Sequence, residues 1–333
     1  MFKIALPRPN LPGLEHLFQA NKGLAAVVKK EVADHLSGKR FLILTFLVVA
    51  ACLASLYIAA TNIRAAATGE DSGFVFLKLF TTAGSNLPFS FTSFVSFLGP
   101  LIGLIMGFDA ISGERDRGTL SHVLSQPIYR DALINGKFIA GVIVLTMVVF
   151  GLGFLTGGLG LVVFGVPPTL EELLRILAYL ALSVIYISFW LALSLLFSVL
   201  FRQTTTSALA GVALWLFFSL FAVFLVGAIT DALIPVTDSS NINQIMANAR
   251  LYQGLSRLSP IALYDEATIT LLNPSVRSLG LVMLDQLYGA IRAPLSFGQS
   301  LLLIWPHLAG LIAATLICFA AAYIIFMRQE IRA

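Results

Sequence analysis

Eight charged side chains lie close together in residues 107–138, the stretch GFDAISGERDRGTLSHVLSQPIYRDALINGKF, which separates two long apolar runs. Four are acidic and four are basic: Asp109, Glu114, Asp116, Asp131, Arg115, Arg117, Arg130 and Lys137. A segment with charges of both signs suits docking onto a protein of matched charge, whereas a lipid-binding segment is predominantly basic. An ordinary solvated loop with local pairs, such as Glu114 with Arg117, fits the same residues. The residue types alone leave both interpretations open.

The spacing within this stretch predicts a short helix and then a turn. Asp109 or Ser112 is suited to cap the start of the helix. An apolar strip at helical spacing follows, formed by Leu120, Val123 and Leu124. Pro127 interrupts this strip, and because proline is tolerated in a first helical turn, a second helix is expected to begin near it. That helix would continue through residues 130–137 into the next apolar run.

Composition indicates the solvent that surrounds most of the chain. The 333 residues are 58% hydrophobic and 11% charged, with a mean hydropathy of +0.91, whereas an average soluble domain has about 25% charged residues. Six apolar segments are long enough to cross a bilayer, namely 41–60, 89–108, 138–165, 173–201, 208–229 and 301–326. Because helices satisfy their own backbone polar groups in lipid, we predict an all-α membrane protein, a six-transmembrane-helix bundle.

The distribution of Lys and Arg predicts how these segments are oriented. With both termini in the cytoplasm, about two thirds of the 21 Lys and Arg residues lie on the cytoplasmic side. Lys39 and Arg40 count most because they directly precede the first segment. The chain is therefore predicted to be a multi-pass protein of the plasma (inner) membrane, with a cytoplasmic loop at 109–137 and an outer segment at 230–300.

Small residues at four-residue spacing indicate where helices pack closely. Gly99, Gly103 and Gly107 follow this spacing in the second segment, and such faces let helix backbones approach one another in lipid. Pro100 lies among them and predicts a kink, a break or a hinge in the same segment.

The apolar segments contain few groups that could relay protons or ions. Proton-driven carriers keep ionisable side chains at depth. Here we single out only His307, near the outer end of the last segment. We predict His307 to be an interfacial histidine, and a self-powered secondary transporter is disfavoured.

The chain also lacks a recognisable ATP-binding motif. Residues 113–118 have the two-glycine spacing of a P-loop, but Thr119 and Leu120 follow where Lys and Ser or Thr must reach phosphate and magnesium. No catalytic residue, metal site or nucleic-acid partner is predicted. The energy for any work must therefore come from another subunit.

The two ends of the membrane domain carry further predicted helices. Residues 1–40 are expected to form an irregular tail and an amphipathic elbow helix that lies in the cytoplasmic interface, with a solvated helix as the alternative. Its apolar face would contain Leu24, Val28, Val32 and Leu36, and Gly38 would end it. Residues 41–333 would form the transmembrane domain. In the outer segment, NQIMANARLYQGLSRL and VRSLGLVMLDQLYGAI are amphipathic and predict helices on the outer surface.

Several stretches resemble ABC-2 type permeases, the membrane subunits of one class of ATP-binding-cassette transporter, particularly their NosY-like branch. Residues 108–138 are similar to the family's cytoplasmic signature. KKEVADHLSGKRF resembles its interfacial elbow, LSPIALYDEAT its outer segment before the last helix, and MRQEIRA its ending.

The resemblance implies an assembly of two permeases, as a homodimer or a heterodimer, with two ATPase subunits, and a substrate route lined by the second and fifth segments. The loop after the second segment would be a coupling helix seated in a cleft of the ATPase. ATP and Mg would bind to the partner, and no cofactor to this chain. By position, the ATPase-coupling residues would be Asp109, Ser112, Gly113, Glu114, Arg115, Asp116, Gly118, Thr119, Leu120, Pro127, Arg130 and Lys137.

We therefore expect a permease subunit, not itself an enzyme, that couples ATP hydrolysis on a partner to movement of a substrate, by family analogy outward. The alternative is a receptor or mechanical transmitter that passes nucleotide-driven motion to an extracytoplasmic protein without moving cargo. ATP-dependent substrate flux in vesicles would separate the two. For the coupling contact, reversal of Glu114 and Arg115 is predicted to abolish ATPase binding and to leave the permease inserted.

Overall fold

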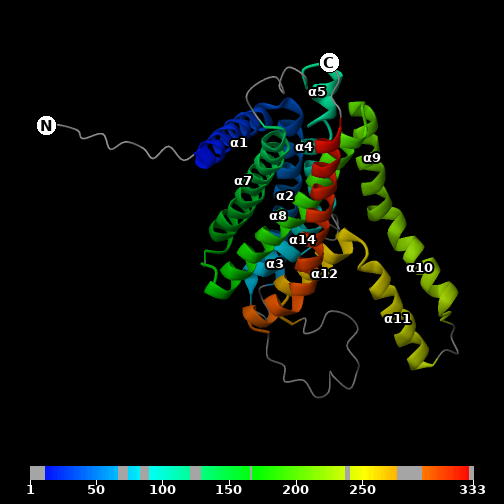
Figure 1. The fold of residues 1–333 in the computed structure, drawn as a ribbon. Coiled ribbons are helices and arrows are strands. Elements are labelled where there is room, and N and C mark those ends of the chain that lie inside the picture. Colours follow the sequence, from blue (N-terminus) through cyan, green and yellow to red (C-terminus); the bar gives the residue numbers. More distant parts are fainter. Residues whose placement is uncertain are drawn as a thin grey trace.

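The computed structural model describes residues 12–66, 74–82, 90–120, 129–165, 167–236, 241–275 and 295–329, and its elements in these ranges are helices (Figure 1). The prediction of an all-α membrane protein is confirmed. The elements are α1 (Pro12–Ser37), α2 (Lys39–Ala66), α3 (Val75–Thr81), α4 (Phe91–Gly107), α5 (Ser112–Asp116), α7 (Arg130–Phe164), α8 (Leu170–Leu200), α9 (Thr204–Leu216), the π-helix η1 (Phe217–Phe221), α10 (Ala222–Leu233), α11 (Ile242–Ser256), α12 (Pro260–Leu272) and α14 (Phe297–Arg328).

Five stretches of helix among the described residues are long and apolar enough to cross a membrane, and a sixth appears if the bent pair 23–37 and 41–54 is counted as one. The predicted first segment lies within α2, the next three within or around α4, α7 and α8, the fifth within α9, η1 and α10, and the last within α14. At about 1.5 Å per residue, the 35 residues of α7 exceed the thickness of the hydrocarbon layer. Helix α7 therefore extends beyond the hydrocarbon layer unless it is strongly tilted.

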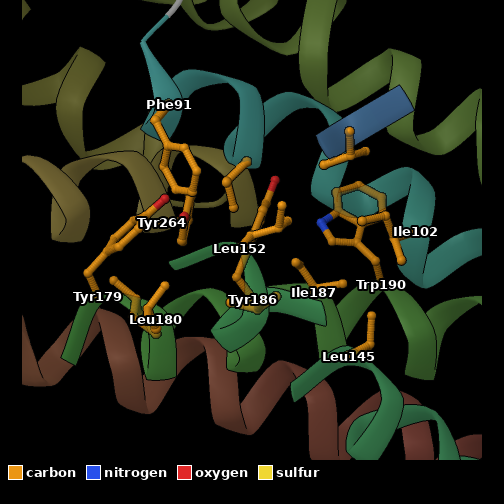
Figure 2. Close-up of a cluster of buried hydrophobic side chains, with 14 of the residues drawn as sticks. Phe91, Ile102, Leu145, Leu152, Tyr179, Leu180, Tyr186, Ile187, Trp190 and Tyr264 are labelled. Atoms are coloured by element: carbon orange, nitrogen blue, oxygen red, sulfur yellow. The ribbon is translucent and has the colours of Figure 1, made fainter. Parts of the chain in front are cut away.

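Helix α8 forms the centre of the bundle and packs against α4, α7, α12 and α14. Its largest side chains, including Tyr179, Tyr186 and Trp190, are fully buried. Figure 2 shows them among apolar residues of the neighbouring helices, with Tyr264 of α12 stacked on Tyr186 at a ring separation of 4.1 Å. At the start of α8, Thr169 and Glu172 form a reciprocal capping box.

The predicted glycine face of the second segment lies against α8. A Cβ added to Gly103 would stand 2.7 Å from the carbonyl oxygen of Ile187, and one added to Gly107 would stand 2.7 Å from Cβ of Ser194. Gly99 faces the side chain of Ile187. Two backbones can approach this closely only where one of them carries no side chain.

Helix α4 continues through Pro100. Proline has no N–H group, so the carbonyl of Ser96, four residues earlier, loses its helical partner. The hydroxyl of Tyr186 donates to that carbonyl at 2.9 Å. A side chain of α8 therefore replaces the backbone bond that proline removes.

The fifth span, formed by α9, η1 and α10, diverges from the rest of the bundle (Figure 1). Only 11% of its most apolar window is buried, and large side chains such as Phe221 and Phe224 are mostly exposed. Helix α11 packs against α10 and contains no buried residue. Its position agrees with the predicted outer helix at 243–258, while the second predicted outer helix, at 276–291, lies outside the described residues.

Helix α12 lies between the two stretches that are predicted to form surface helices. It packs against α8, α14 and α4, and Tyr264, Ala267 and Leu271 are fully buried. This helix is too short to cross the hydrocarbon layer, so it inserts only part of the way into the bundle.

Candidate functional site

The short helix α5 lies at one end of the bundle, beside the start of α9 and the C-terminal end of α14 (Figure 1). It ends in a Schellman motif, because the N–H of Gly118 donates to the carbonyl of Arg115 and the N–H of Thr119 to that of Glu114. Gly118 has a φ of +67°, a left-handed conformation that favours glycine. The sequence GERDRGT thus sets the length of the helix.

The cap at the start of α5 comes from another helix. The prediction that Asp109 or Ser112 caps it is wrong, since Ile111 occupies the cap position and makes no side-chain cap bond. The hydroxyl of Ser198, near the end of α8, accepts hydrogen bonds from the N–H groups of Ile111 and Ser112 at 2.9 and 3.0 Å. Sequence spacing cannot reveal a cap that is 87 residues away.

A buried chain of three charges joins α5 to α7 and α1. Lys137 Nζ lies 2.8 Å from Glu114 Oε1 and 2.9 Å from Glu31 Oε1, and all three side chains are at most 11% exposed. Burial alone raises the pKa of Glu31, but Lys137 and Lys30 outweigh it and hold that pKa below its ordinary value. The local pair of Glu114 with Arg117 is replaced by this long-range pair.

The elbow helix α1 packs along α7 through a face that the sequence pattern misses. The predicted apolar face includes Leu36, which is exposed, whereas Val27 and Glu31 are the buried residues. Gly136 makes room for Val27, because a Cβ there would lie 2.5 Å from Val27 Cγ1. The predicted stop at Gly38 agrees with the structure, in which α1 ends at Ser37 and the chain bends by 59° before the apolar part of α2.

Two further bonds tie α5 to the remaining spans. Arg115 Nη2 donates to Oε1 of Gln329, the residue after α14, at 2.6 Å. The carboxylate of Asp116 accepts from the backbone N–H of Thr204, the first residue of α9, at 2.9 Å and also from its hydroxyl. Arg130, which begins α7, donates to the carbonyl of Gln329 at 3.2 Å. Helix α5 is therefore bonded to α7, α8, α9 and the end of α14.

The predicted coupling residues divide into two groups in the structure. The buried group attaches α5 to the bundle and comprises Ser112, Gly113, Glu114, Leu120 and Lys137. The exposed group forms the tip of the loop and comprises Asp116, Gly118 and Thr119, together with Arg117, which is also exposed. Asp109, Arg115 and Arg130 are half-buried, and Pro127 lies outside the described residues.

Charged groups missed by the sequence analysis lie at the other end of the bundle. Arg175 of α8 is fully buried and donates to the carbonyls of Leu271 and Leu295 at 2.7 and 2.6 Å. His307, predicted to be interfacial, has a side chain that is 3% exposed, and its Nε2 lies 2.7 Å from Oε2 of Glu266. Burial alone raises the pKa of Glu266, but hydrogen bonds from Arg257, His307 and Gln253 hold it at about 2.

No group of three or more His, Cys, Asp or Glu residues in the described part of the chain is placed to hold a metal ion. The tip of the α5 loop is exposed and carries charges of both signs, and buried hydrogen bonds join α5 to the long apolar helices.

Comparison with known proteins gives a matching family and two relatives. The family described as ABC-2 family transporter protein matches residues 25–331. The protein named "Probable ABC transporter permease protein NosY" from Pseudomonas aeruginosa is 29% identical over 197 residues, which cover 58% of this chain and 66% of that protein. The protein of the same name from Stutzerimonas stutzeri is 32% identical over 141 residues, 42% of this chain and 46% of the relative. The matches thus span slightly less than two thirds and about half of these relatives.

Proposed function

Because the chain belongs to the ABC-2 transporter family, we propose that it is the permease subunit of an ABC transporter and that a separate ATPase docks on the tip of α5. ATP and Mg would bind to that ATPase, and this chain would couple the hydrolysis to translocation of a substrate. The observation that carries the proposal is the contrast within α5, between an exposed tip at residues 116–119 and buried anchors on several spans.

The anchors give a physical basis for coupling. A displacement of α5 acts on α8 through Ser198, on α7 through Lys137 and on α9 through Thr204. Buried hydrogen bonds and ion pairs resist separation, because breaking one leaves an unpaired polar group away from water. Motion at the tip therefore moves several spans together instead of bending the loop alone.

A second permease copy completes the proposed assembly, with two ATPase subunits. The exposed apolar side chains of η1 and α10 and the divergence of the fifth span support a partner on that side. Phe97 of α4, which is partly exposed, packs against Trp215 of α9 and so lies beside the same span. The substrate route would then run between the copies along α4 and the fifth span. We infer export as the direction, with α5 and both termini in the cytoplasm and the chain in the plasma membrane.

Docking is tested with Arg117→Glu, which reverses a charge at the exposed tip. The permease and its ATPase would be co-expressed and purified through a tag on the permease. We expect Arg117→Glu to lower ATPase recovery at least fivefold, whereas the control Lys29→Glu, on the exposed part of α1, retains it. Equal recovery with both variants, each monodisperse, would contradict docking at the tip. Reversal of Glu114 is less informative than predicted, because it breaks the internal pair with Lys137.

A mechanical transmitter remains the second candidate because of α11. This helix has no buried residue, and Ile242 and Ile245 are exposed on it. An extracytoplasmic protein could bind that surface and receive motion from the bundle without any cargo. Substrate flux in vesicles that contain the ATPase supports transport, whereas ATP-driven release of a bound partner without flux supports transmission.

A further inference from the structure

Two adjoining cavities lie at the end of the bundle opposite α5, on either side of Asp265. The first, of about 370 Å³, lies between α4, η1 and α12. The second, of about 440 Å³, lies between α12, α11 and the fifth span. Both are lined by Ser219, Ile261, Asp265 and Ile269. Each is within the size range of small-molecule binding sites.

The walls of the first cavity present polar groups that the protein leaves unpaired. The hydroxyls of Ser219 and Thr268 are buried and have no hydrogen-bond partner among the described residues. Thr268 as a whole is 4% exposed. Buried polar atoms are normally paired, so these hydroxyls, whose residues line the cavity, could pair with a molecule there after a side-chain rotation. Ser219 also lies in the π-helix η1, and such wide turns are frequent at functional sites.

Asp265 is the one acidic group of the cavities without a basic partner among their described lining residues. Burial raises its pKa to about 6, opposed only by a hydrogen bond from Ser96. Arg257 lines the second cavity but donates to Glu266 through Nε at 2.9 Å and Nη2 at 2.7 Å. A buried carboxylate without a counter-charge is costly, so a ligand that supplies a positive charge would gain affinity there.

The remaining walls are apolar and aromatic. Phe97 borders the first cavity, and Phe218, Val223, Val226 and Tyr252 border the second. Aromatic rings attract organic cations through their faces, and apolar side chains remove the rest of such a molecule from water. An inorganic cation would leave these walls unused, and a neutral apolar molecule would leave Asp265 unpaired.

We propose that the two cavities together bind an amphipathic organic cation, with its ammonium group at Asp265, Ser219 and Thr268 and its apolar body along Phe218, Val223 and Val226. The proposal rests on the proposed transport function, because α4 and η1 belong to the two spans along the proposed route. It adds the class of substrate. The carboxylate of Asp265 would pair with the positive charge, and the two hydroxyls would accept hydrogen bonds from the N–H groups of a primary amine.

The test uses dansylcadaverine, a fluorescent primary amine with an aromatic body, and its uncharged N-acetyl derivative. Binding to the full chain in lipid nanodiscs is measured by fluorescence polarisation at pH 8, with and without the co-purified ATPase. We expect Asp265→Asn to weaken binding of the amine at least tenfold and Thr268→Val several-fold. The control Asp231→Asn changes an exposed acid of α10 and should leave binding unchanged. The N-acetyl derivative should bind the wild type at least tenfold more weakly than the amine.

Equal binding of the amine to the wild type and to a monodisperse Asp265→Asn variant would overturn the proposal, as would equal binding of the two probes. Failure of transport gives a different result: the amine binds in an Asp265-dependent way, but it neither changes ATPase activity nor accumulates in vesicles. In that case the cation site stands and the proposed function is rejected.

Discussion

The two ends of the bundle differ in one charged side chain: both contain paired groups, such as Lys137 with Glu114 and Arg257 with Glu266, but the end opposite α5 also contains Asp265. At the α5 end, Lys137 is shared between Glu114 and Glu31, and the carboxylate of Asp116 is bonded to Thr204. At the other end, Asp265 has no basic partner in the described lining of its cavities. The first arrangement holds parts of the protein together, whereas the second leaves interactions for another molecule. On the proposed function, force would enter at the α5 end and recognition would occur at the other.

The largest expected effect is the loss of the shared lysine at the α5 end. Lys137→Met leaves Glu114 buried without a counter-charge and leaves Glu31 with the exposed Lys30 as its basic partner, which should lower stability by about 3–5 kcal/mol. Thermal unfolding in detergent measures this, with the exposed Lys29→Met as a control. An unchanged midpoint for Lys137→Met would remove the distinction between the two ends.

The next effect concerns the helix pair that connects the ends. Gly103→Ala places a methyl group 2.7 Å from the backbone of α8, so the helices must separate at a cost of about 1–3 kcal/mol. At Gly157 an added Cβ meets nothing within 4 Å, and Gly157→Ala should therefore not lower the unfolding midpoint. Similar midpoints for the two variants would show that α4 and α8 are not packed as described.

A smaller effect of the opposite sign is expected at Asp265. Because burial raises its pKa to about 6, the carboxylate is charged at pH 8 and destabilises the folded state relative to a neutral side chain. Asp265→Asn should therefore raise stability at pH 8 by about 1–2 kcal/mol. The gain should shrink as the pH falls below about 6, and it should disappear only below the ordinary pKa of 3.8, where the carboxyl is protonated in the unfolded chain as well. A loss of stability at pH 8 would mean that Asp265 has a structural partner.

The smallest effect on stability is expected for Thr204→Val. Asp116 is fully exposed, so loss of its bond to the Thr204 hydroxyl should not shift the unfolding midpoint measurably. The same variant should reduce the stimulation of ATPase activity by substrate, because it weakens the link between α5 and the fifth span. Unchanged stimulation would show that motion does not pass through this contact.

Much of the fold could be predicted from the sequence because lipid imposes simple rules. Spans must be about 20 residues long and apolar, and their ends follow Lys and Arg. The start of α7 near Pro127 and the stop at Gly38 rest on equally local signals, which the structure reproduces. Local patterns of this kind need no knowledge of the neighbouring helices.

The contacts of the candidate site could not be predicted in the same way. Ser198 caps α5 from a distant helix, and Lys137 pairs with Glu114 and Glu31, which are far from it in the sequence. The burial of α12 has no signal in its sequence pattern, yet Tyr264 is fully buried. Each of these outcomes depends on which helices are neighbours, and hydrophobic period alone does not specify that.

The bond from Tyr186 to the carbonyl of Ser96 has a consequence for how the two ends communicate. Near Pro100, a side chain of α8 replaces one backbone hydrogen bond of α4. If the Tyr186 hydroxyl releases the carbonyl of Ser96, the turns of α4 before Pro100 can tilt while the later turns stay helical. Ser96 also hydrogen-bonds Asp265. A cation at Asp265 and the angle of this joint would therefore be thermodynamically linked. By reciprocity, whatever fixes the joint from the α5 end must change the affinity for the cation by the same factor.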